Sequence, residues 1–101
     1  MSRIEKWLKL KYICEQVFEK GEAIKVVHKE NTGFTENDFD FFIDVKFSED
    51  FTVFDDAVIY TFSKALKNDG FELKEWRIIC ECENEHLTLR FQAFVKEVDA
   101  E

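Results

Sequence analysis

The stretch from residue 36 to residue 56, ENDFDFFIDVKFSEDFTVFDD, constrains the fold most strongly. Every second position in its first half is apolar, and these residues are Phe39, Phe41, Ile43, Val45 and Phe47. Asp38, Asp40 and Asp44 fall between them. Because successive side chains of a strand point to opposite faces, the alternation predicts a strand over residues 38–47 with one apolar and one acidic side. Such a strand favours a sheet that is covered by helices on a single face.

Two segments carry the apolar spacing of amphipathic helices. The first covers residues 2–20, where Ser2 and Glu5 form a capping-box pattern at the predicted start. The second covers residues 52–68, where apolar residues recur at the helical period and Asn68-Asp69-Gly70 marks the end.

Three further strands are predicted over residues 22–30, 75–83 and 86–96, and Asn84-Glu85 is the expected tip of the last hairpin. The order is therefore α-β-β-α-β-β. We expect one domain over residues 1–101, an α+β two-layer sandwich with a four-stranded, mostly antiparallel sheet and both helices on one face. Alternation within 75–83 places one set of side chains on the helix side, pointing into the core, and this set is Trp76, Ile78, Cys80 and Cys82.

The charge is unevenly distributed along the chain. The formal net charge is −8, and residues 30–56 alone hold one lysine and nine acids. Such a surface repels nucleic acid and anionic membranes and attracts a basic partner. The first residues lack the apolar run of a signal peptide. The chain has three cysteines, an odd number that cannot all form disulfides within one chain. We therefore expect a cytoplasmic protein with reduced cysteines.

The sheet face away from the helices is the predicted partner-binding surface. It collects acids and large apolar groups, namely Asp38, Asp40, Asp44, Glu81, Phe42, Ile79 and Phe94. The cations Arg77, Arg90 and Lys46 fall on the same face. The adjoining segment adds Glu49, Asp50, Asp55 and Asp56. An apolar patch rimmed by charge is typical of an interface. Alternate strand residues lie about 6.7 Å apart, so this acid row would also imitate nucleic-acid phosphates. The alternative interpretation is an acidic face that only keeps a phenylalanine-rich protein soluble.

Two patterns raise the question of chemistry. Cys80-x-Cys82 with His86, and Cys14 as a further ligand, resembles half a zinc site. However, cysteines that point into the core behave as small hydrophobes, so we expect no metal and no cofactor. Asp38-x-Asp40 with His28 has oxygen and imidazole groups that suit a divalent cation. The chain has no nucleophile elbow and no phosphate-binding glycine loop, so we expect no catalysis.

The sequence thus predicts a non-enzymatic protein-binding domain of the inhibitor, immunity or adaptor type, which presents an acidic, partly aromatic sheet face to a basic protein. Direct binding to nucleic acid or a membrane is not expected. Two alternatives stay open. One is a metal-dependent hydrolase or nuclease accessory that uses Asp38, Asp40 and His28, and the other is an architectural subunit of a homo-oligomer, such as a homodimer.

Overall fold

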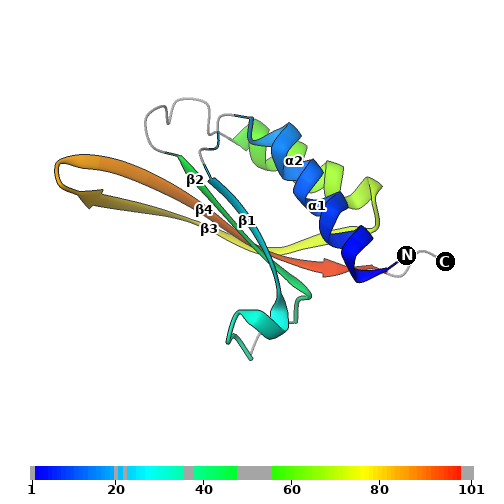
Figure 1. Cartoon of the computed structure of the whole chain (residues 1–101). Coiled ribbons are helices and arrows are strands. Elements are labelled where there is room, and N and C mark those ends of the chain that lie inside the picture. Colours follow the sequence, from blue (N-terminus) through cyan, green and yellow to red (C-terminus); the bar gives the residue numbers. More distant parts are fainter. Residues whose placement is uncertain (1, 20, 22, 36–37, 48–55, 99–101) are drawn as a thin grey trace.

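A computed structural model describes residues 2–19, 21, 23–35, 38–47 and 56–98. In chain order, the elements are α1 (Arg3–Val17), β1 (Ala23–His28), a short 3₁₀ turn η1 (Lys29–Asn31), β2 (Phe41–Phe47), α2 (Asp56–Asn68), β3 (Phe71–Glu83) and β4 (His86–Glu97). The four strands form one sheet in the order β1-β2-β4-β3, and all neighbours are antiparallel. Both helices lie on one face of this sheet (Figure 1). The predicted α+β fold is confirmed.

Helix α1 begins as the capping pattern predicts. The Ser2 side chain accepts a hydrogen bond from the Glu5 backbone N–H at 3.2 Å, which satisfies one of the helix's initial donors. The helix ends at Val17, three residues before the predicted end. The Trp7 indole Nε1 donates to the Val26 carbonyl at 2.6 Å and so ties α1 to the edge strand β1. Among the described residues, no helix is long and apolar enough to cross a membrane.

The core lies between the helices and the two central strands. The predicted alternation of apolar and polar residues is confirmed over β2, because every second side chain from Phe41 to Phe47 is buried and those between are half-buried. Phe18, just after α1, packs its ring against Phe62 of α2 at 4.9 Å and against Phe91 of β4 at 5.1 Å. These aromatic contacts join the two helices to the sheet.

The strand prediction is wrong at the start of β2. The strand was expected from residue 38, but it begins at Phe41, after a bend at Asp40. Phe39 is buried as predicted, yet it packs against Phe94 with ring centroids 4.9 Å apart, and Phe94 belongs to the face away from the helices. The bend breaks the alternation, because a period of two holds only while the backbone stays extended.

The β3–β4 hairpin projects beyond the two helices (Figure 1). Its tip is the predicted Asn84-Glu85 turn, where both residues have positive φ, at 52° and 66°, as a type I′ turn requires. We call residues 76–90 of this hairpin the arm. The helix-side residues of β3 were predicted to point into the core. They lie on the predicted face, but Trp76, Ile78, Cys80 and Cys82 are all exposed, because the helices end before they cover the arm.

Candidate functional site

Asp38 and Asp40, the first two acids of the predicted row, contact residues at the end of β4. Lys96 Nζ lies 2.5 Å from Asp38 Oδ2, and this hydrogen bond holds the pKa of the Asp38 carboxyl below its ordinary value. The same contact raises the pKa of Lys96. Asp40 Oδ2 accepts a hydrogen bond from the Glu97 backbone N–H at 2.7 Å. These two carboxylates therefore secure the end of β4 to the start of β2.

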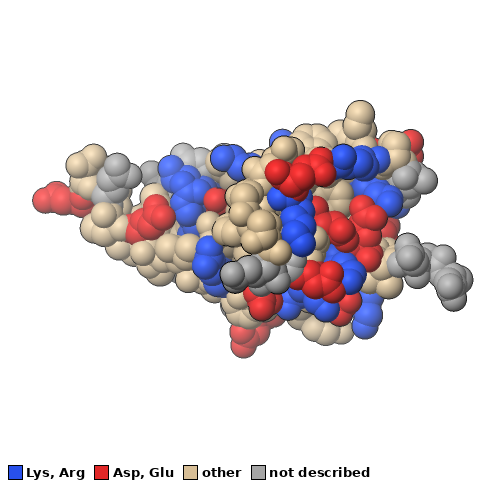
Figure 2. Space-filling model, turned by 90° about the horizontal axis from the view of Figure 1, so that it is seen from below, with Lys and Arg blue, Asp and Glu red and all other residues tan. Residues whose placement is uncertain are grey.

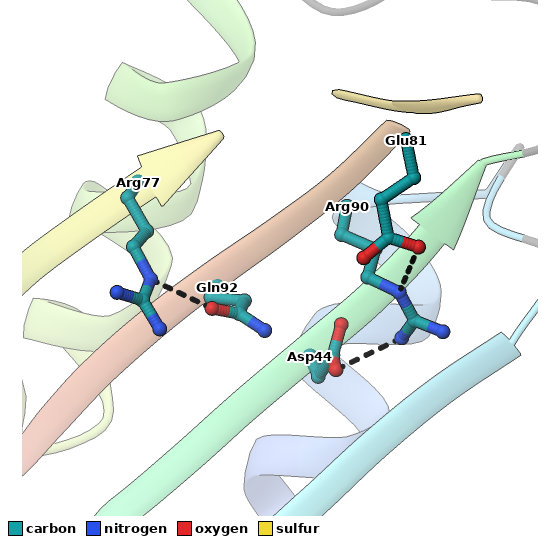
Figure 3. Close-up of polar contacts among 5 residues, drawn as sticks. All are labelled: Asp44, Arg77, Glu81, Arg90 and Gln92. Atoms are coloured by element: carbon teal, nitrogen blue, oxygen red, sulfur yellow. Dashed lines mark hydrogen bonds and ion pairs between the residues drawn. The ribbon is translucent and has the colours of Figure 1, made fainter. Parts of the chain in front are cut away.

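The middle of the acid row is organised by Arg90. Its guanidinium lies 3.0 Å from Asp44 Oδ2 on β2 and 3.6 Å from Glu81 Oε2 on β3 (Figure 3). Beside this bridge, Arg77 Nε donates to Gln92 Oε1 at 2.7 Å. The other Asp44 oxygen is buried without a hydrogen-bond partner among the described residues. Because β4 lies between β2 and β3, its cation reaches the acids of both neighbours.

As a result, the outer sheet face is not uniformly acidic. Lys and Arg side chains alternate with Asp and Glu over the view from below the sheet (Figure 2). A row of phosphate-like charges requires carboxylates without local counterions, whereas Asp38 and Asp44 each have a cation of β4 as partner. Paired charges of this kind steer a distant partner less strongly than the sequence alone suggests.

Two apolar residues of the outer face, Phe42 and Phe94, pack in a cluster of aromatic rings. Phe34, in the loop before β2, packs against Phe42 at 5.5 Å and against Phe94 at 5.6 Å, and Phe39 completes a four-ring cluster. Only 6% of Phe94 is exposed, against 40% of Phe34. Phe42 and Phe94, which were predicted to hold a partner, pack against Phe34 and Phe39 in this cluster. The sequence reasoning missed Phe34, whose position after Gly33 in a turn gave no sign of this packing.

The remaining predicted residues are divided between two places. Ile79 and Glu81 lie on the arm, on its outer face. Asp56 is the exposed first residue of α2. Glu49, Asp50 and Asp55 lie outside the described residues. The described part of the structure therefore places Phe42, Asp44, Ile79, Glu81 and Phe94 on one sheet face. Asp38 and Asp40 contact the end of β4 beside that face, and Asp56 lies apart on α2.

The residues considered for a zinc site are separated. Cys14 lies on the buried face of α1, and burial raises the pKa of its thiol to about 12. Cys80 and Cys82 lie on the helix side of β3, whereas the register places His86 on the opposite face. The His28 ring packs on Phe41 at 4.8 Å. No group of three or more His, Cys, Asp or Glu residues within the described chain could hold a metal ion.

A cavity of about 650 Å³ opens where α1 begins and η1 meets the end of β4. Charges of both signs line it, including His28 and Asp40. Two of its cations have acidic partners, because Arg3 pairs with Glu30 and Lys6 Nζ lies 2.8 Å from a Glu97 carboxylate oxygen. These pairs link the start of α1 to η1 and to the end of β4.

The helix side of the arm presents the clearest unoccupied surface. We call its apolar residues, Trp76, Ile78, Cys80, Cys82 and Leu87, the arm strip. Trp76 is 45% exposed, Ile78 41% and Leu87 51%. The Trp76 ring rests on buried Phe91, with centroids 6.1 Å apart, so one end of the strip is anchored to the core. The arm carries no lysine or arginine between Arg77 and Arg90.

No protein-family model, curated protein or solved structure matches the chain.

Proposed function

We propose that this chain is a non-catalytic protein-binding domain that engages its partner through the arm strip. The observation that supports the proposal is the exposure of Trp76, Ile78 and Leu87 on one face of a hairpin that projects past the helices (Figure 1). Single exposed apolar residues are common on protein surfaces, but adjacent ones on one face are typical of an interface. Tryptophan is also enriched among the residues that dominate binding energy.

The register makes the strip continuous. Cys82 lies directly opposite Leu87, and Ile78 lies opposite Phe91 at the base of the arm. Cross-strand neighbours of this kind have Cβ atoms about 5 Å apart, so their side chains touch. A two-stranded ribbon is only marginally stable by itself in water. A partner laid against this face would both bury the strip and stiffen the arm.

The charge of the arm indicates the chemistry of the partner. Glu81 and Glu85 lie beyond Arg77, and the nearest cation on the return strand is Arg90, which already bridges Glu81 to Asp44. The tip of the arm therefore carries acidic residues next to the apolar arm strip. A complementary surface has an apolar centre and a basic rim, and the net charge of −8 would speed its approach at low salt. The proposal keeps the basic partner predicted from the sequence and assigns it to the arm.

A capture experiment with matched variants tests the proposal. The arm variant is Ile78→Asp/Leu87→Asp, and the control is Ile4→Asp/Tyr60→Asp, which adds the same charge at helix residues that are 71% and 68% exposed. A partner captured from the native host would then be purified and titrated by calorimetry. We expect the arm variant to lose at least about a hundredfold in affinity and the control to lose little. Equal affinity of both variants would exclude the arm strip as the binding site.

A further inference from the structure

The outward edge of β3 is an unpaired strand edge. β3 is the last strand in the order β1-β2-β4-β3, and within the described residues it pairs with β4 alone. Natural edge strands usually carry a proline, a bulge or an inward-pointing charge that prevents pairing with another chain. The chain has no proline, and the one irregularity of β3 lies at Leu73/Glu75, before the arm begins.

The arm itself has no such protection. From Trp76 to Glu83, β3 follows β4 in regular register. Its helix-side residues over 76–82 are Trp, Ile, Cys and Cys, so no inward-pointing lysine blocks an added strand. The helices do not extend over this part of the strand (Figure 1). A second strand can therefore approach the edge without meeting the helical layer.

The sequence of the arm is complementary to itself in the antiparallel direction. A two-fold axis through Ile79 places Ile79 opposite its own copy and Arg77 opposite Glu81 of the other chain. Both contacts lie on the outer face, and the opposite charges form two symmetric pairs. On the helix side, the same register places Ile78 opposite Cys80, so apolar residues meet apolar residues.

We infer that two copies of this chain pair antiparallel along β3, with Ile79 at the centre, and so form one continuous eight-stranded sheet. The pairing uses the edge of β3 and leaves the helix-side face of both arms open. It brings the two arm strips side by side between the two helical layers. The inference goes beyond the proposed partner binding and does not depend on it.

Sedimentation equilibrium tests the pairing on the wild-type protein. We expect a concentration-dependent mass that rises from 12.1 kDa towards twice that value. A mass that stays at 12.1 kDa up to submillimolar protein would overturn the inference. That result would leave the proposed function untouched, because the function is tested with an identified partner and with substitutions at Ile78 and Leu87.

A charge exchange tests which surface pairs. Arg77→Glu creates two symmetric pairs in which a carboxylate faces Glu81 of the second chain, and Glu81→Arg creates two symmetric pairs in which a guanidinium group faces Arg77. We expect each variant alone to dimerise about tenfold more weakly or worse. A mixture of the two variants should form the heterodimer, because both cross-chain pairs are then of opposite sign. A wild-type dimer that neither substitution weakens would show that another surface pairs, and would overturn the inference.

A cysteine placed at the axis tests the register. In a Cys80→Ser/Cys82→Ser background, Ile79→Cys brings two thiols directly opposite each other, within reach of a disulfide. Arg77→Cys in the same background is the control, because its two thiols lie four residues apart in register. We expect mild oxidation to cross-link the first variant much faster than the second. Equal cross-linking of the two would rule out a centre at Ile79.

Discussion

The buried thiol of Cys14 should make the fold sensitive to alkaline pH. Cys14 is fully buried on the inner side of α1, and burial together with the neighbouring Glu15 charge raises its pKa from 9.0 to about 12. The folded state therefore holds the thiol proton more tightly than the unfolded state does. Its contribution to stability is complete below pH 9.0 and is lost as pH rises from 9.0 towards about 12.

The size of the effect follows from the two pKa values. Each pKa unit is worth about 1.4 kcal/mol, so the full difference between 9.0 and about 12 corresponds to roughly 4 kcal/mol. At about pH 10.5, halfway between the two values, the loss should be about 2 kcal/mol. For a domain of this size, this is a large fraction of a total stability of about 5–15 kcal/mol.

Urea denaturation at about pH 7 and about pH 10.5 measures this loss, with Cys14→Ala as the control. The alanine variant should be less stable than wild type at neutral pH by about 1 kcal/mol, because it leaves a small cavity. It should, however, lack the thiol contribution to the alkaline loss. If wild type and Cys14→Ala lose the same free energy of unfolding between these pH values, the reasoning from burial is refuted.

Three further predictions concern the outer face of the sheet. Phe94→Ala should lower the free energy of unfolding by about 3 kcal/mol in urea denaturation, because it removes the buried centre of the four-ring cluster; a loss below about 1 kcal/mol would contradict that packing. Arg90→Met should destabilise by about 1–2 kcal/mol, since it removes the ion-pair partner of the mostly buried Asp44 carboxylate, while Arg77→Met should change stability by less than about 0.5 kcal/mol; equal losses in a parallel denaturation series would show that the bridge adds nothing. In a carbon-detected NMR titration, the pKa of the Asp38 carboxyl should lie below 3.8 and return towards that value in Lys96→Met. The stabilisation from the Asp38–Lys96 contact is present above the ordinary pKa of Asp38 and is lost as the pH falls through its lowered pKa. An unchanged titration midpoint in Lys96→Met would exclude Lys96 as the cause.

Several parts of the fold follow directly from local sequence patterns. The alternation over β2, the Ser2 cap and the Asn84-Glu85 turn are all confirmed. Each depends on contacts between residues close in the chain, where a repeat of two or 3.6 residues, or one side chain and a nearby backbone N–H, decides the conformation. The element order and the separation into two faces follow for the same reason.

The composition of the surfaces depends on contacts between distant residues. Asp44 meets Arg90 across 46 positions of sequence, because the strand order places β4 beside β2. Phe34 covers Phe94 because a loop folds back across the outer face. Neither the strand order nor the path of that loop is encoded in a short-range period, so the sequence alone did not predict which charges pair or which rings meet on this face.

The arm shows the same division most clearly. Alternation in β3 correctly assigned Trp76 and Ile78 to the helix side of the sheet. The same alternation predicts that Trp76 and Ile78 are buried only if helices cover the whole length of β3. β3 is a 13-residue strand, long enough to extend past the helical layer, and the exposed apolar face that results is set by the relative lengths and positions of helices and strands in space. The sequence determined which way these side chains point, and the tertiary structure decided whether anything lies above them.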